Sequence, residues 1–352
     1  MPRSVIDPWA AVAELKADLA RNYVARYLRG EYALVDTHLH ITRESLIQYP
    51  DDFRAFLATC GAKMGRDEKS EGVGDFSEAD FHAAVESGGG GVRVESAVFV
   101  EVLPVEPSAI AEARWVLDMA SSSKSVVESV VVHIPVMLGE AAVHQWMADL
   151  AASLGEDRFA EARRRIRGCR QVLASEPLGV FGSGALLDGL GALAKLQLGS
   201  EPAPLHFEFC VKASQLEGVL HAVRSTPATR FVLDHCGLND SGQDFEAWKR
   251  HMSALAGCDN VVGCKLSAIE EWDCVDGEPA PYLDHALSCF GTKRCMYGGN
   301  WFVPLNFDKP YSETARLVGL ALQRMCASAE QVADVFENTA RRVYGLDGGG
   351  DE

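Results

Sequence analysis

Three side chains that can bind a metal or transfer a proton stand at alternate positions of LVDTHLH, residues 34–40. Asp36, His38 and His40 end an apolar run, and alternate residues of a β-strand point to the same side. Imidazoles at positions i and i+2 can reach one cation, with zinc–nitrogen distances of about 2.0–2.1 Å. The stretch therefore predicts a strand that ends in a metal-binding or acid–base site.

Further apolar runs also carry polar side chains near their ends. The candidate site residues on them are Glu101, His133, Arg170, His206, Glu208, His235, Lys265, Ser267, Asn300 and Trp301. A single histidine in a strand is more often a satisfied interior group than a ligand, so each position has a structural alternative. In VLDHCG the alternation points Asp234 away from His235, and we expect Asp234 to be a structural hydrogen-bond partner.

The elements that must position these residues are eight strand-length runs separated by segments of helical periodicity. The runs are residues 32–40, 92–102, 126–136, 166–173, 204–211, 230–237, 261–269 and 294–301. This alternation predicts a parallel (β/α)8 TIM-type barrel, whose C-terminal strand ends would bring the polar residues to one mouth. A doubly wound open sheet is the alternative, but the first run lacks the GxGxxG turn that would favour it.

The domain organisation follows from the same pattern. We expect an N-terminal helical arm at residues 1–30, one barrel domain at 31–347 and a flexible tail at 348–352. Residues 41–91 lengthen the first strand-to-strand connection. Insertions after a strand's C-terminal end lie over the mouth of a barrel, so this segment should partly cover the site.

The composition of the chain restricts the classes of molecule with which the protein is expected to interact. A net charge of −17 argues against nucleic acid and anionic membranes as partners, because both require basic surfaces. Ten scattered cysteines without a CxxC pair are typical of reduced thiols in the cytoplasm. We expect a cytoplasmic protein that acts on a small-molecule substrate, with its oligomeric state open and a homo-oligomer allowed.

Together the motifs resemble the amidohydrolase superfamily over residues 32–346, and most closely its amidohydrolase-related branch of fuconolactonase-like and rhamnonolactonase-like lactonases. VDTHLH resembles the branch's D-x-H-x-H, FVLDHCG its V-x-D-H-x-G, and CKLSAI its C-K-[LI]-S-G. The resemblance implies hydrolysis of a lactone or carboxylic ester of the sugar-acid lactone class. It further implies a divalent metal, zinc foremost, held by His38, His40 and His235.

RCMYGGNWFVP departs from the branch's R-x-M-[FY]-G-[ST]-D-W-P-V, because Asn300 stands where relatives carry a metal-binding, proton-accepting aspartate. An amide cannot act as that base and is a poorer ligand, so a metal-independent site is the alternative. In that case the imidazoles and Lys265 would stabilise the oxyanion, and His235 or a nearby carboxylate would be the base.

The expected roles are catalytic for His235, Lys265 and Asn300. Substrate binding is expected at Glu101, Arg170, His206, Glu208 and Trp301, with Arg170 gripping a substrate carboxylate. Two other functions compete with hydrolysis. They are decarboxylation or hydration of a small unsaturated acid, and binding of a metabolite by a degenerate barrel without turnover.

Overall fold

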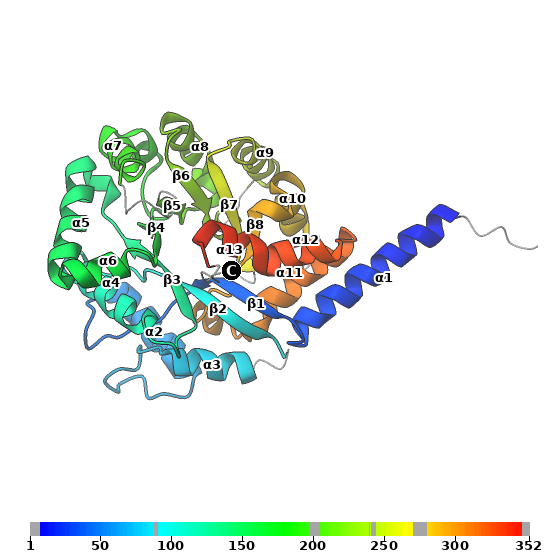
Figure 1. Cartoon of the computed structure of the whole chain (residues 1–352), viewed down its shortest axis with the longest axis horizontal. Coiled ribbons are helices and arrows are strands. Elements are labelled where there is room, and N and C mark those ends of the chain that lie inside the picture. Colours follow the sequence, from blue (N-terminus) through cyan, green and yellow to red (C-terminus); the bar gives the residue numbers. More distant parts are fainter. Residues whose placement is uncertain are drawn as a thin grey trace, which may run out of the picture.

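The computed structural model describes residues 8–87, 91–196, 205–238, 240, 244–269 and 280–346. Eight parallel strands pair in sequence order and curl into a nearly closed barrel (Figure 1). The strands are β1 (Ala33–Leu39), β2 (Arg93–Val100), β3 (Val127–His133), β4 (Ile166–Arg170), β5 (His206–Phe209), β6 (Arg230–Leu233), β7 (Val261–Leu266) and β8 (Cys295–Tyr297). The predicted (β/α)8 barrel is confirmed, and the open-sheet alternative is excluded.

The barrel closes where the first strand meets the segment after the last one. Leu39 forms a parallel bridge with Trp301, and the His40 amide donates to the Trp301 carbonyl at 2.9 Å. Lower in the barrel the Thr37 hydroxyl donates to the carbonyl of Tyr297 at 2.6 Å. These contacts bring the two histidines of the first strand beside the residues that follow β8.

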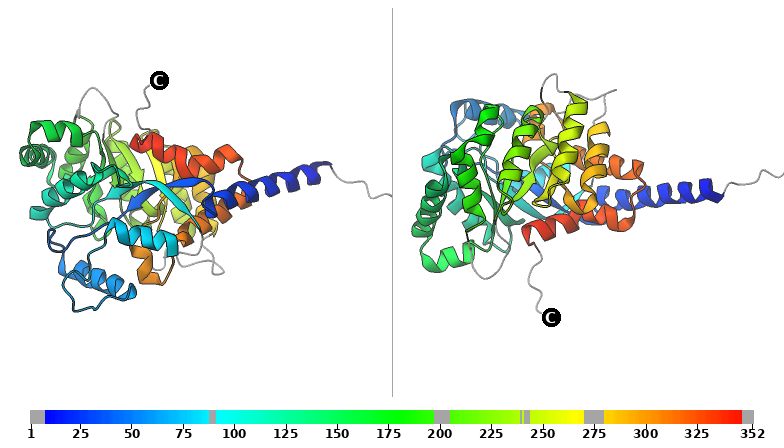
Figure 2. Two further views of the ribbon diagram at one scale, coloured as in Figure 1. Left: turned by 60° about the horizontal axis from the view of Figure 1, so that its bottom comes forward. Right: turned by 90° about the horizontal axis from the view of Figure 1, so that it is seen from above.

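Helices between the strands cover the outside of the barrel (Figures 1 and 2). They are α1 (Pro8–Leu28), α2 (Asp51–Lys63), α3 (Glu78–Ser87), α4 (Glu106–Ala120), α5 (Glu140–Leu154), α6 (Glu156–Ala162), α7 (Gly184–Leu193), α8 (Leu216–Ser225), α9 (Phe245–Ala256), α10 (Ala280–Phe290), α11 (Ser312–Arg324), α12 (Ala329–Ala333) and α13 (Thr339–Tyr344). Helix α9 illustrates why they form. Asp244 caps its first turn, and Trp248, Met252 and Leu255 place one apolar face against the barrel.

Helix α1 packs on the barrel only through its C-terminal part, and its other end extends away from the molecule (Figures 1 and 2). Val24 and Tyr27 are buried, whereas Leu15 is 59% exposed. The close approach requires Gly319 of α11, because a Cβ at that position would lie 2.7 Å from Val24 Cγ1. Helix α1 is therefore fixed to the barrel by its last turns.

The observed ends of two strands differ from those expected from the sequence. β4 ends at Arg170 and β6 at Leu233, which is earlier than the apolar runs suggested. A 3₁₀ turn follows β6 at once, and residues 171–173 after β4 form no regular structure. The proposed tail at 348–352 lies outside the described residues. None of the helices in the described part of the chain combines the length and apolar character needed to cross a membrane.

Candidate active site

A cavity of about 320 Å³ opens at the C-terminal ends of the strands. Its polar end is formed by His40, Arg170, His235 and Asn300, which come from four different βα junctions. Phe53 and Phe56 of α2 line the same cavity, so the segment between β1 and β2 covers part of the mouth as expected. Catalytic sites of TIM barrels lie at this face, and the cavity is therefore the candidate active site.

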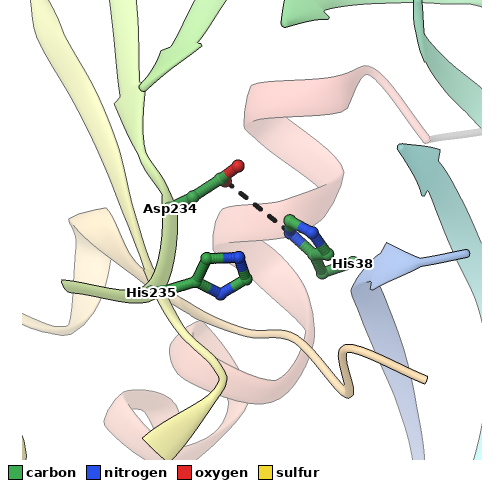
Figure 3. A group of neighbouring side chains, drawn as sticks. All are labelled: His38, Asp234 and His235. Carbon is green, nitrogen blue, oxygen red and sulfur yellow. Dashed lines mark ion pairs between the residues drawn. The ribbon is translucent and has the colours of Figure 1, made fainter. Parts of the chain in front are cut away.

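The turn after β6 brings two neighbouring polar side chains into the barrel. Asp234–Cys236 form a single 3₁₀ turn in which His235 has the left-handed backbone angles φ 58° and ψ 24°. This turn breaks the alternation of the strand, so Asp234 and His235 both face His38 (Figure 3). The expectation that Asp234 points away is wrong for that reason. A left-handed non-glycine residue is costly and is typical of functional sites.

Both nitrogens of His38 and of His40 have protein partners. Lys265 Nζ, which can only donate, lies 3.3 Å from His38 Nδ1. His38 Nε2 lies 3.1 Å from Arg170 Nη1, which is also a donor, and 3.2 Å from His40 Nε2. The carbonyl of Val100 only accepts, so His40 Nδ1 donates to it at 2.9 Å. The two rings therefore belong to one polar network with Lys265 and Arg170.

Burial and the neighbouring positive charges keep the rings of His38 and His40 neutral. Burial, followed by the Lys265 charge, holds the pKa of His38 well below its ordinary value. Burial and the Arg170 charge lower the pKa of His40 to about 3. Neither imidazole carries a proton charge at neutral pH, and neither has a nitrogen left to act on a substrate.

His235 differs from the other two histidines. Its Nδ1 lies 2.7 Å from the Ser267 hydroxyl, and its ring centroid lies 4.5 Å from that of His38. Its Nε2 has no partner among the described residues, and the side chain lines the cavity. Burial, then the charges of Arg170 and Lys265, hold the pKa of His235 well below its ordinary value. The ring is therefore an unprotonated imidazole, available to accept a proton.

Beneath the polar end lies a buried ion network, which consists of Glu101, Arg170, Glu208, Asp234 and Lys265. Lys265 Nζ lies 2.5 Å from Glu208 Oε2 and 3.1 Å from Asp234 Oδ1. Burial alone would raise the pKa of Glu208, but the charges and hydrogen bonds of Lys265 and His206 together outweigh it and lower that pKa. Burial prevails at Asp234 and raises its pKa to about 6.

Arg170 completes the network from the other side. Its Nε donates to Glu101 Oε1 at 2.7 Å, its Nη2 to the Glu101 carbonyl at 2.5 Å, and its Nη1 to Asp234 Oδ2 at 3.2 Å. Burial opposes ionisation of Glu101, but Arg170 and His133 together outweigh it and lower the pKa of Glu101 to about 2. Four of the five N–H groups of the guanidinium therefore have partners among the described residues, which leaves Arg170 one N–H for a substrate where a bidentate grip of a carboxylate uses two.

The donor types near His38 suit a divalent metal. One ligand atom each from His38, Asp234 and His235 lies within 4.8 Å of the others, so these residues form a group that could hold an ion (Figure 3). Their surroundings do not suit it, because Lys265 and Arg170 already occupy both nitrogens of His38 and both oxygens of Asp234. Of the three residues, His235 alone keeps a ring nitrogen without a partner among the described residues, so a metal would have to displace Lys265 and Arg170 to gain the other two ligands.

The remaining predicted site residues lie around the cavity without lining it. His206 and Tyr344 both donate to Glu208 Oε1, at 3.0 and 2.6 Å, below the ion network. His133 contacts Glu106 at 2.9 Å on the outer side of Glu101. Trp301 is fully buried, so its indole supports the floor of the mouth without facing the cavity.

Two further features were not assigned from the sequence. Asp36 accepts from the Gly299 amide at 2.7 Å and from the Tyr311 hydroxyl at 2.7 Å, so it holds the segment after β8 in place. The cavity walls include Phe302 and Phe307, which follow β8. The signal available for them was FVPLNF directly after the strand-eight motif.

Comparison with known proteins agrees with this architecture. The sequence pattern of the family described as Amidohydrolase matches residues 35–346. L-fucono-1,5-lactonase of Burkholderia multivorans is 33% identical over 222 residues, which span 58% of this chain and 72% of that protein. The uncharacterized protein y4mH of Sinorhizobium fredii is 33% identical over 101 residues, which span 28% of this chain and about a third (32%) of that protein.

Solved structures show the same fold. An amidohydrolase from Burkholderia multivorans with bound zinc has a TM-score of 0.66 at 21% identity, covering 90% of this chain and 100% of that one. A 2,6-dihydroxybenzoate decarboxylase from Rhizobium has a TM-score of 0.53 at 11% identity, covering 90% and 99%. With the family pattern spanning nearly the whole barrel, the chain belongs to the amidohydrolase family, in its lactonase-like branch, and is an enzyme of the hydrolase class.

Proposed function

We propose that this protein hydrolyses a lactone or a simple carboxylic ester at the barrel mouth. The observation that carries the proposal is the unprotonated His235, whose Nε2 has no partner among the described residues and whose side chain lines the cavity. The similarity to a fuconolactonase supports a lactone as the substrate type. A general base must be within reach of a substrate and unprotonated at the working pH, and His235 meets both conditions.

The reaction requires only water and the ester. His235 Nε2 takes a proton from a water molecule as the water oxygen attacks the carbonyl carbon. The amide N–H of Asn300 and the positive field of Arg170 stabilise the developing oxyanion, since both residues face the same cavity. The ring C–O bond then breaks, and the imidazolium returns its proton to the leaving alkoxide. A base with a low pKa is weak, so the site suits reactive esters.

A metal could use His38 and Asp234 as ligands only by displacing the two protein cations beside them. Zinc, the metal present in the related solved structure, would have to release His38 and Asp234 from Lys265 and Arg170. The two protein cations already supply positive charge at this place. We therefore propose hydrolysis that does not depend on an added metal.

The test is to incubate the protein with a panel of lactones and aryl esters and to measure the release of acid. Chelator-treated protein is compared with zinc-supplemented protein. We expect turnover in both samples at similar rates. Turnover only after zinc addition would contradict the metal-independent route. Release of CO₂ from an unsaturated acid without ester hydrolysis would assign the decarboxylase alternative, and ligand binding without turnover would assign the non-catalytic alternative. Decarboxylation ranks lower because the protein contacts of Arg170 leave it one N–H, fewer than the two that a bidentate grip of the substrate carboxylate uses.

A further inference from the structure

The walls of the active-site cavity are strongly apolar. Phe53 and Phe56 of α2 line the cavity together with Phe302 and Phe307, which follow β8. The rings are neighbours: Phe53 and Phe56 stack at 5.8 Å between centroids, and Phe56 lies 6.4 Å from Phe302. Valine, leucine and cysteine side chains make up the rest of the wall. The cavity is therefore an aromatic-sided slot with polar groups at one end.

The polar groups that a sugar lactone needs are missing from the lining. Among the described residues that line the cavity, none carries a hydroxyl or a carboxylate. Arg170 is already engaged by Glu101 and Asp234, so it cannot serve several substrate hydroxyls. Hydroxyl groups buried against phenylalanine without a partner would oppose binding, since each loses its hydrogen bonds to water.

We propose that the substrate is a small lactone or ester whose body is apolar and flat, with one carbonyl as its chief polar group. The body lies between the phenylalanine rings, and the carbonyl meets His235 and Asn300 at the polar end. A volume of about 320 Å³ equals that of roughly ten water molecules, which is enough for one or two fused rings. This inference rests on the proposed ester hydrolysis and replaces the sugar-acid lactone that the sequence suggested.

Two six-membered lactones of opposite character test the inference. They are 3,4-dihydrocoumarin, which carries a fused benzene ring, and glucono-1,5-lactone, which carries hydroxyl groups. We expect kcat/KM for dihydrocoumarin to be higher by about 100-fold or more, after normalisation to each compound's rate with hydroxide. Equal values, or a preference for gluconolactone, would overturn the apolar substrate class while leaving ester hydrolysis intact.

Variants locate the effect. Phe53→Asn should lower the ratio of kcat/KM for dihydrocoumarin to that for gluconolactone by roughly tenfold or more. The matched control is Phe159→Asn on α6, because both phenylalanines are partly buried at the edge of the core and only Phe53 lines the cavity. Thermal unfolding of both variants shows whether they fold. A folded Phe53→Asn protein with unchanged selectivity would overturn the proposal.

A binding measurement separates this inference from the proposed function. The lactam 3,4-dihydro-2-quinolinone has the shape of dihydrocoumarin but resists hydrolysis, and its affinity can be measured by calorimetry against gluconolactam. If neither lactone is hydrolysed, ester hydrolysis fails. Preferential binding of the aromatic lactam would still support an apolar ligand, whereas preferential binding of gluconolactam, or no binding of either, would overturn it.

Discussion

At the scale of single residues, both ring nitrogens of His38 already contact other side chains, which leaves neither of them directed at a substrate. Lys265 lies beside its Nδ1, and Arg170 and His40 lie beside its Nε2. The HxH pair, which on its own resembles a metal site, is here part of a network with two protein cations. Of the three histidines at the barrel mouth, His235 is the one whose Nε2 has no partner among the described residues.

Lys265→Met tests whether a protein cation holds the place of a metal. Removal of the ammonium leaves Glu208 and Asp234 buried with less compensating charge, and we expect unfolding to become easier by about 3–5 kcal/mol. The same change frees His38 Nδ1, so zinc should bind more tightly and restore stability. Thermal unfolding and calorimetry with and without zinc measure both effects.

The control for this prediction is Lys249→Met, whose ammonium pairs with Glu246 on the surface of α9. We expect a change within about 0.5 kcal/mol, since surface ion pairs contribute little. A Lys265→Met protein that is as stable as the control, and that gains no zinc affinity, would show that the ammonium is not what excludes a metal.

Asn300→Asp introduces the residue type that the motif resemblance implies at strand eight. The added carboxylate shares the cavity with His235, and a nearby negative charge favours the imidazolium. The pKa of His235 should therefore rise. Since hydrolysis needs the neutral ring, the acid limb of the kcat/KM profile should move to higher pH. Asn338→Asp, at an exposed position directly before α13, should leave the pH profile unchanged. A profile that is identical in both variants would place Asn300 outside the reaction.

At the scale of elements, the ion network links the ends of β2, β4, β5, β6 and β7 across the barrel. His133 at the end of β3 joins it to the surface, with Nδ1 3.8 Å from Glu101 Oε2 and Nε2 2.9 Å from Glu106 Oε1. Burial opposes the imidazolium, but hydrogen bonds to the two carboxylates outweigh it and raise the pKa of His133 from 6.5 to about 9.

This shift predicts a pH-dependent part of the stability. A folded-state pKa above the unfolded one stabilises fully below pH 6.5, and the contribution disappears as pH rises through about 9. The free energy of unfolding of wild type should exceed that of His133→Gln by on the order of 1–3 kcal/mol at pH 6, and the difference should vanish near pH 10. Denaturant titrations across this range measure it. His144→Gln, half exposed on α5, should show a small, pH-independent difference. A His133→Gln difference that stays constant with pH would refute the assigned charge.

The strands and the order of their polar ends could be predicted from the sequence, because β-branched runs and helical periodicity are local signals. The inward turn of Asp234 could not, since it depends on the left-handed backbone of His235 rather than on strand alternation. Local sequence patterns also could not show that Arg170 pairs with Glu101 and Asp234. Its partners Glu101 and Asp234 lie 69 and 64 residues away along the chain, and only the closed barrel brings them together.

At the scale of the whole molecule, the barrel carries the fold and α1 is an appendage fixed at one end (Figure 2). Val24→Ala should lower the free energy of unfolding by about 0.5–1.5 kcal/mol or more, because its side chain is fully buried against α11. Leu15→Ala should change it by less than about 0.5 kcal/mol, since Leu15 is largely exposed. Equal losses in the two variants would mean that the outer part of α1 is also covered in solution.

The central claim is that the folded barrel hydrolyses an ester with His235 as its base. The most direct test is kcat/KM for dihydrocoumarin, measured at pH 7 on chelator-treated wild type and His235→Asn. The account predicts that the variant folds, still binds the lactam analogue, and loses roughly 10²–10⁴-fold in kcat/KM. Equal hydrolysis by the two proteins would contradict the account, because it would place the reaction away from this imidazole.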